Sequence, residues 1–124
     1  MIKNFHDFLN ESINDTYSAK KIAEYVYNRL SDEQKENNDW DFEEYYNTIK
    51  SFGDKYKLIN INPSELKFNE DFDKYTIEEY EDKLNNGEKL PPIVIDKHFE
   101  IIDGNHRAKA SLNLNKNIDA YVAL

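Results

Sequence analysis

The chain has 124 residues and a formal net charge of −9, and it contains nine Tyr, seven Phe and one Trp but no Cys. This length predicts one domain, or one domain with a helical arm, with enough apolar side chains to bury a core. The lack of Cys excludes disulfides, thiolate catalysis and Cys-ligated metals. No apolar run approaches the roughly 20 residues that span a bilayer, and no secretory signal is visible, so we expect a cytoplasmic protein that does not bind membranes.

The acidic balance argues against canonical DNA binding. A protein that binds duplex DNA neutralises phosphates with clustered Lys and Arg side chains. The longest basic run here is Lys20-Lys21, and the remaining basic feature is a small local spot around Arg107, Lys109 and Lys116. The simplest explanation of the negative charge is that it keeps the protein soluble. The alternative is that the protein is an acidic mimic of DNA.

The first twelve residues predict a short amphipathic helix, because Ile2, Phe5, Phe8 and Leu9 recur at helical spacing. This opening resembles the N-terminal peptides of T-even-type phage head proteins, in which an amphipathic segment ending in Leu/Ile-x-Glu is cut by the prohead protease. The resemblance implies a bacteriophage protein that acts in the host cytoplasm, and packaging in the virion with cleavage after Glu11 is the alternative. An ordinary first helix that packs on the domain would give the same pattern.

Two longer helices are expected in the first half of the chain. The helix at 17–30 has an apolar stripe formed by Ala19, Ile22, Ala23, Val26 and Leu30. The helix at 40–52 has Asp39 as a candidate N-cap and Gly53 as a candidate C-terminal stop. We therefore assign residues 1–55 to an N-terminal helical segment.

The second half of the chain alternates between strand and helix patterns. The expected elements are a strand at 56–62 ended by Pro63, a helix at 77–84 with a capping box of Thr76 and Glu79 and a stop at Gly87, a hairpin at 93–102, a helix at 105–113 and a strand at 118–124. The order over residues 56–124 is thus β-α-β-β-α-β, which predicts a compact α+β domain.

One stretch, Ile101 to Arg107, combines a buried strand, a tight turn and the start of a helix. Gly104 lets the backbone approach a ligand closely. The first N–H groups of a helix lack internal partners, and the macrodipole adds partial positive charge there. Arg107 adds a planar fork of donors suited to phosphate or carboxylate. The pattern predicts an anion site, and the alternative is a hairpin turn with a solvated His106 and Arg107.

The element order and the Asp-Gly-Asn-His-Arg stretch together resemble the ParB/sulfiredoxin superfamily over roughly residues 57–124. The shared features are a first strand followed closely by Pro63, a helix that ends in Asn-Gly before Pro-Ile, a hairpin that leads into the Asp-Gly-Asn-His-Arg stretch, and a final Ile-x-x-Tyr-Val strand. The fold class that this implies is an N-terminal helical segment, residues 1–55, followed by a ParB/sulfiredoxin-like β-α-β-β-α-β domain, residues 56–124.

In this superfamily the Gly-x-x-Arg turn binds nucleotide phosphates. The resemblance implies that Gly104, Asn105, His106 and Arg107 cradle phosphate, and that Asp103 supports the turn or helps to hold Mg²⁺. ATP, ADP and CTP are the implied nucleotides, because sulfiredoxins use ATP, a free serine kinase uses ADP and ParB proteins hydrolyse CTP. NAD is the alternative, because some relatives are ADP-ribosyltransferases.

The chain also departs from the family. No Cys lies beside Gly104, which excludes a sulfiredoxin, and no helix-turn-helix follows, so we do not expect a complete chromosome-partitioning ParB. Asn105-His106-Arg107 stands where ParB has Glu-Arg-Arg, which is closer to the sulfiredoxin and serine-kinase branches. In the kinase branch a Glu beyond the first strand acts as base. Glu65 is the candidate, followed by Glu70, and an exposed carboxylate at a helix start is the alternative for Glu65.

Two classes of function remain open. The leading expectation is nucleotide-dependent phosphoryl transfer or hydrolysis. Arg107 would bind phosphate, and His106 would bind phosphate or act as an acid/base catalyst. Glu65 or Asp103 would be the base or a metal ligand. ADP-ribosyl transfer from NAD is a variant of it. The rival is a non-catalytic phage accessory protein that uses residues 1–52 to bind and modulate a host protein.

Overall fold

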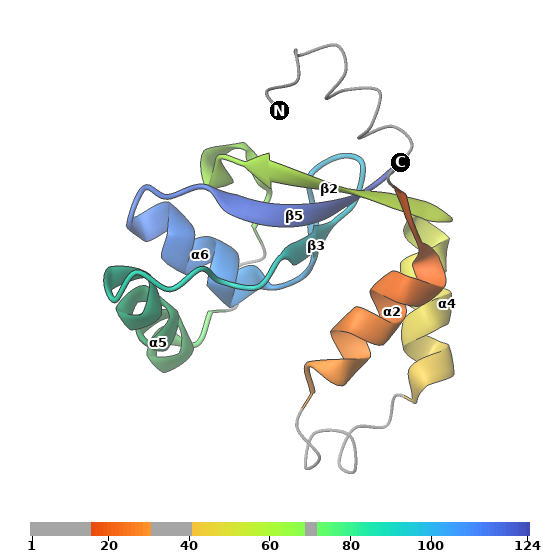
Figure 1. Cartoon of the computed structure of the whole chain (residues 1–124), viewed down its shortest axis with the longest axis horizontal. Helices are drawn as coiled ribbons and strands as arrows, with labels where there is room; N and C mark the ends of the chain where they lie inside the picture. The colour runs from red at the N-terminus through yellow and green to blue at the C-terminus, as the bar shows by residue number, and fades with distance from the viewer. Residues whose placement is uncertain (1–15, 31–40, 69–71) are drawn as a thin grey trace, which may run out of the picture. The chain divides into compact units, whose positions relative to one another are not determined.

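The computed structural model describes residues 16–30, 41–68 and 72–124. These residues form an α+β fold with four α-helices and a five-stranded mixed sheet of order β1-β2-β5-β3-β4 (Figure 1). The elements are β1 (Thr16–Ser18), α2 (Ala19–Asn28), α4 (Phe42–Phe52), β2 (Lys55–Ile61), the 3₁₀ turn η1 (Pro63–Glu65), α5 (Lys74–Asn85), β3 (Ile93–Ile95), β4 (Ile101–Asp103), α6 (Asn105–Asn113) and β5 (Ile118–Ala123). The expected helix in residues 1–12 and the cleavage after Glu11 lie outside the described residues.

The chain divides into two compact units. One contains residues up to Lys57 together with Ala123–Leu124, and the other contains Leu58–Val122. In the first unit α2 packs against α4, and Ser18 caps α2 by accepting a hydrogen bond from the Lys21 N–H at 3.2 Å.

The start of α4 differs from the prediction. The helix begins at Phe42 and not at Trp40, because Asp41 is the N-cap and its carboxylate accepts the Glu44 N–H at 3.0 Å. Gly53 ends the helix as predicted, and its φ of 167° is extended backbone. A Cβ on Gly53 would lie 3.3 Å from the carbonyl oxygen of Leu124. Close packing therefore accounts for this glycine.

The strand β1 was not predicted. It pairs antiparallel with β2, with Tyr17 opposite Tyr56, and its three residues are too few to show a β-strand periodicity in the sequence. The buried Tyr56 hydroxyl donates a hydrogen bond to the Ile49 carbonyl oxygen at 2.6 Å, which joins β2 to α4 within the first unit.

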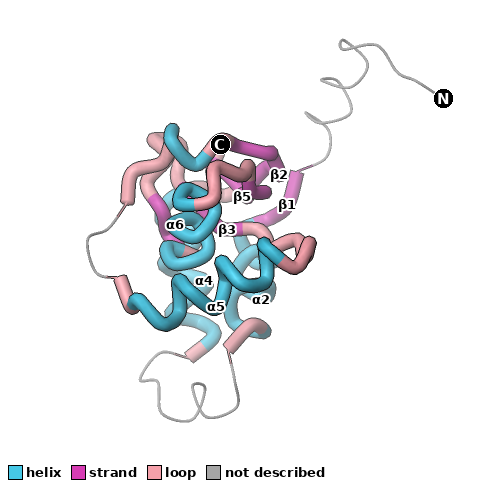
Figure 2. The backbone as a smooth tube through the Cα atoms, turned by 90° about the vertical axis from the view of Figure 1, so that its left-hand side faces the viewer, coloured by secondary structure: helices cyan, strands magenta, loops and turns pink. Residues whose placement is uncertain are grey.

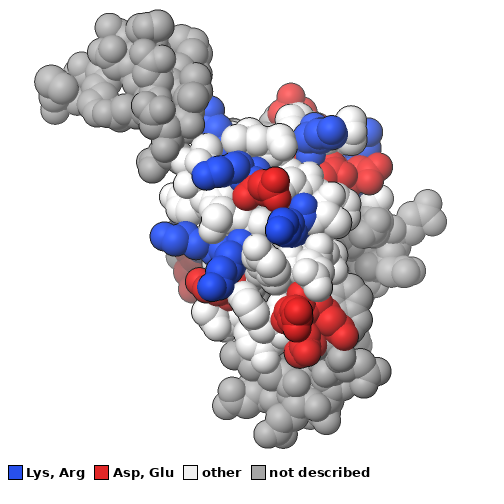
Figure 3. All heavy atoms as spheres, turned by 90° about the vertical axis from the view of Figure 1, so that its right-hand side faces the viewer, with Lys and Arg blue, Asp and Glu red and all other residues white. Residues whose placement is uncertain are grey.

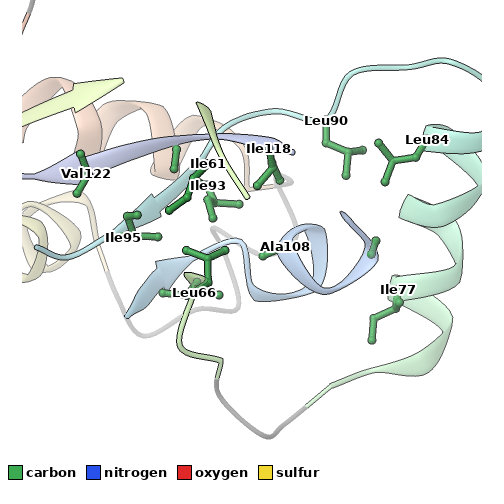
Figure 4. Close-up of a cluster of buried hydrophobic side chains, with 13 residues drawn as sticks. Ile61, Leu66, Ile77, Leu84, Leu90, Ile93, Ile95, Ala108, Ile118 and Val122 are labelled. Atoms are coloured by element: carbon green, nitrogen blue, oxygen red, sulfur yellow. The ribbon is translucent and has the colours of Figure 1, made fainter. Parts of the chain in front are cut away.

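The second unit has the predicted β-α-β-β-α-β order. β3 and β4 form the predicted antiparallel hairpin, and β3 also pairs in parallel with β5, with Val94 opposite Tyr121. α5 and α6 lie side by side, and α6 lies between α5 and the strands β3 and β5 (Figures 1 and 2). The core between them is drawn in Figure 4, and its larger side chains are Ile61, Leu66, Ile77, Leu84, Leu90, Ile93, Ile95, Ile101, Ile118 and Val122.

The two helices of this unit were predicted with different success. α6 has the predicted bounds, 105–113. α5 begins at Lys74, so the capping box of Thr76 and Glu79 is wrong: Asp73 is the N-cap, and the Thr76 hydroxyl donates to its carboxylate at 2.6 Å. Gly87 ends this helix region with a φ of +83°, as its position predicted.

Candidate functional site

The candidate site is the junction between β4 and α6. β4 ends at Asp103 and α6 begins at Asn105, so Gly104 alone makes the turn, with φ 98° and ψ 26°. A Cβ on Gly104 would lie 2.5 Å from Cγ2 of Ile93 and 2.8 Å from Nη2 of Arg107. The positive φ and the packing around the turn therefore require glycine at this position without reference to any ligand.

The N-terminus of α6 is not capped by a side chain. Gly104 is its N-cap residue and has no side chain to offer, and no side-chain capping hydrogen bond forms there. The first internal bond of the helix runs from the Ala108 N–H to the Gly104 carbonyl oxygen at 3.0 Å. The amides of a first helical turn point outward and carry partial positive charge, which favours an anion in front of them.

Arg107 supports the turn from inside the protein. Its side chain is 5% exposed, and its Nε donates to the Pro91 carbonyl oxygen at 3.2 Å. Its Nη2 donates to the Pro92 carbonyl oxygen at 3.0 Å and to the Asp103 carboxylate at 3.4 Å. The guanidinium thus ties the residues before β3 to the end of β4, and its charge lies beneath the first turn of α6.

His106 joins α6 to the start of α5. Its Nε2 accepts a hydrogen bond from the Asp73 N–H at 2.8 Å, which assigns the ring proton of the neutral imidazole to Nδ1. The hydrogen bond from Thr76 lowers the pKa of Asp73, desolvation opposes this, and the Tyr75 amide and the nearby His106 lower the pKa further. The carboxylate that caps α5 is therefore held in its charged form.

A cluster of two rings and one cation lies beside His106. The ring of Phe72 is 6.2 Å from the imidazole and 6.2 Å from the ring of Phe68. The Lys109 ammonium lies 5.5 Å from the Phe72 ring centre and 5.9 Å from that of Phe68. His106 and Lys109 are three residues apart and therefore share one side of α6. Neither Phe68 nor Phe72 was predicted as a site residue, because their sequence signal was no more than a place in the loop before α5.

Glu65 and Asp103 occupy different environments. Glu65 is exposed on η1, which packs against α6, and within the described residues no hydrogen bond or ion pair links its carboxylate to the turn. The Asp103 side chain is 34% exposed and faces Arg107. In residues 16–30, 41–68 and 72–124 no group of three or more His, Asp or Glu side chains is arranged for a metal. The carboxylate that the turn itself could offer to Mg²⁺ is that of Asp103.

The small basic spot predicted around Arg107, Lys109 and Lys116 is not a single patch. Arg107 is buried in the first turn of α6, Lys109 lies on the two Phe rings, and Lys116 follows the other end of the helix. On the face drawn in Figure 3, Lys and Arg side chains are interspersed with Asp and Glu. In the part of the chain that the structure describes, no helix has the length and hydrophobicity needed to cross a bilayer.

One solved structure is similar to this chain in its fold. No protein-family profile and no curated protein matches the chain. Among solved structures it is similar to the C2221 crystal form of a Pnob8-like ParB-N domain, with a TM-score of 0.46 and 20% sequence identity. The match covers 54% of this chain and 29% of that chain. The fold resembles a ParB-N domain. The similarity concerns the fold alone, and the chemistry of the turn rests on its own residues.

Proposed function

We propose that this chain is a nucleotide-binding protein that holds phosphate at the first turn of α6. The observation that carries the proposal is the N-terminus of α6, which begins directly after Gly104 without a side-chain cap and has the Arg107 guanidinium buried beneath it. Backbone amides in this arrangement favour phosphate oxygens, and the fixed positive charge of Arg107 strengthens the favourable potential.

The burial of Arg107 changes the role that we propose for it. Because its Nε and Nη2 are engaged by Pro91, Pro92 and Asp103, Arg107 acts as a positioning residue that fixes the turn and supplies charge. Lys109 shares a side of α6 with His106 and supplies the cation that contacts phosphate. Asn105 and the Nδ1–H of His106 add polar contacts from the same turn.

The catalytic part of the proposal is phosphoryl transfer or hydrolysis of the bound nucleotide. Such reactions depend mainly on positioning and on neutralising charge, so Mg²⁺ would come with the phosphates and take at most one ligand from Asp103. Asp103 is engaged by Arg107, which leaves the exposed Glu65 on η1 as the base. ADP-ribosyl transfer from NAD would use the same hold on a diphosphate.

The test is a titration of the ¹⁵N-labelled full chain with ATP, ADP, CTP, GTP and NAD, each with and without Mg²⁺. We expect saturable shifts at the amides of Asn105, His106 and Arg107 for at least one nucleotide. Lys109→Ala should weaken that binding about tenfold, and the control Lys97→Ala, an exposed lysine outside the site, should bind as wild type does.

Two results would count against the proposal. Shifts that are absent for every nucleotide, or confined to residues outside the first turn of α6, would remove the binding site. Binding without release of product from any nucleotide would remove the catalytic part and favour a binding module.

A further inference from the structure

Ser111 has a polar group that the fold leaves without a partner. The residue lies in the last two turns of α6 and is 0% exposed. Its backbone carbonyl oxygen accepts the Lys116 N–H at 2.9 Å, but its hydroxyl has no hydrogen-bond partner among the described residues. A buried hydroxyl without a partner costs roughly 1–3 kcal/mol, so natural proteins normally satisfy it.

Ser111 also lines a cavity of about 180 Å³. This cavity lies in the second unit, between the C-terminal ends of α5 and α6 and the start of β5, and so at the opposite end of α6 from Gly104. Leu84, Leu90 and Ile118 form its apolar wall, and Figure 4 shows the first two facing one another at the α5 side of the core. Pockets for drug-sized ligands run from about 300 to 1,000 Å³, so this cavity suits a molecule of only a few heavy atoms.

Two of the acceptors in the cavity wall, the side chains of Asp119 and Asn60, are already used. Asp119 accepts from the Lys89 ammonium at 2.7 Å and from the Asn60 amide at 2.9 Å, and Asn60 accepts in turn from Asn117 at 3.1 Å. Desolvation raises the pKa of Asp119, but the hydrogen bonds from Lys89 and Asn60 and the charge of Lys89 lower it overall. The carboxylate is therefore charged, and Lys89 neutralises it.

The remaining polar groups in the wall include several that can donate. They are the Ser111 hydroxyl, the exposed Lys116 ammonium, and the further N–H groups of Lys89 and Asn117. Glu88 is an exposed carboxylate in the same wall, and its side chain can turn into solvent. A wall with apolar side chains on one part and surplus donors on another matches a small molecule with an anionic head and a short apolar stem.

We propose that this cavity binds a small oxyanion, a carboxylate or phosphate group on a short stem, with Ser111 and Lys116 as its donors. The site is separate from the phosphate site proposed at the first turn of α6 and shares no residue with it. Its occupant gives the Ser111 hydroxyl a partner that no residue in the described ranges provides.

The test uses the ¹⁵N-labelled full chain at constant ionic strength. Propionate and inorganic phosphate are the two anionic probes, and propionamide is the neutral match for propionate. We expect saturable shifts at the amides of Ser111 and Lys116 and at the side-chain amide of Asn117 with at least one anion, and none with propionamide. A response to propionate alone assigns a carboxylate, and a response to phosphate alone assigns a phosphate group.

Two variants separate binding from folding. Lys116→Ala should weaken binding at least tenfold, while Lys97→Ala, an exposed lysine in the turn between β3 and β4, should leave it unchanged. Ser111→Ala should weaken binding several-fold and keep or raise the melting temperature, because it removes a hydroxyl without a partner.

Several outcomes would overturn the proposal. Equal shifts with propionamide would show a neutral polar site, and no shift with any probe would leave a cavity that holds water. A Ser111→Ala variant that melts lower and binds equally well would show that the hydroxyl has a structural partner. Shifts confined to Asn105 and His106 would assign the anion to the other end of α6.

Discussion

The Nε2 atom of His106 accepts the backbone N–H of Asp73 at 2.8 Å, so the first turn of α6 holds the residue that caps α5. Loss of the His106 acceptor should therefore speed hydrogen exchange at the Asp73 amide. The exchange rate of this amide, measured by NMR in wild type and in His106→Ala, checks the expectation, and an amide that stays protected in the variant would contradict it.

Replacement of His106 tests the same bond at constant pH. His106→Ala should lower the free energy of unfolding by about 0.5–1.5 kcal/mol, the usual net value of one hydrogen bond, with some additional loss from the contact with Phe72. His98→Ala is the control, because the side chain of His98 is exposed in the turn between β3 and β4. Urea denaturation of the three proteins gives the comparison, and equal stability for both variants would show that the bond contributes nothing.

Asp73 should give the protein a distinct response to acid. Its pKa lies below the ordinary value in the folded state, so its charge stabilises the fold above about pH 4, and this contribution is lost as the pH falls through the folded pKa. Asp73→Asn keeps a good N-cap and removes the titration. The melting temperature of the variant should therefore fall less than that of wild type between pH 6 and pH 3, and parallel curves would rule out the contribution.

The two glycines with positive φ form a matched pair. Gly104→Ala combines an unfavourable backbone angle with a Cβ only 2.5 Å from Ile93, so it should cost roughly 2–4 kcal/mol of stability. Gly87→Ala has a similar φ, +83°, but no atom within 4 Å of the new Cβ, so it should cost only about 1–2 kcal/mol. Equal losses in chemical denaturation would mean that Ile93 moves away at little cost.

Arg107 should be a stability residue as well as a site residue. Arg107→Ala removes the donor to the Pro91 carbonyl oxygen and one donor to the Pro92 carbonyl oxygen, and it should cost about 2–4 kcal/mol. Arg107→Lys should recover little of the stability that Arg107→Ala loses, because one ammonium does not reproduce the planar guanidinium that reaches both carbonyl groups. If Arg107→Ala keeps wild-type stability and loses only nucleotide binding, Arg107 is a direct phosphate ligand and not a positioning residue.

The sequence predicted the elements whose signals are local and strong. The bounds of α6 were predicted from the β-branched residues before it, from Gly104 and from the helical pattern that follows. The hairpin of β3 and β4 was predicted from two apolar runs on either side of a short turn. The caps of α4 and α5 were misplaced because several Asp, Asn and Thr residues compete near each helix start, and the side-chain geometry decides among them. Pattern alone does not resolve that competition.

The environment of the turn depended on contacts that are distant in the sequence. Arg107 is buried by carbonyl groups 15 and 16 residues earlier in the chain, and His106 is bound to an amide 33 residues earlier. The sequence therefore placed the candidate site and its residue types. It did not predict that Arg107 faces inward or that Lys109 is the cation on the outer side of α6.

The strand order carries a consequence for synthesis of the protein. β5 lies between β2 and β3 in the sheet, yet it is the last of the five strands to leave the ribosome. Until residues 118–123 have emerged, β2 and β3 have no strand between them, and the backbone N–H and C=O groups along their facing edges lack the partner that β5 supplies. Long-range pairing of this kind slows folding and exposes the nascent chain to aggregation, so the need for chaperones should fall once β5 has been synthesised.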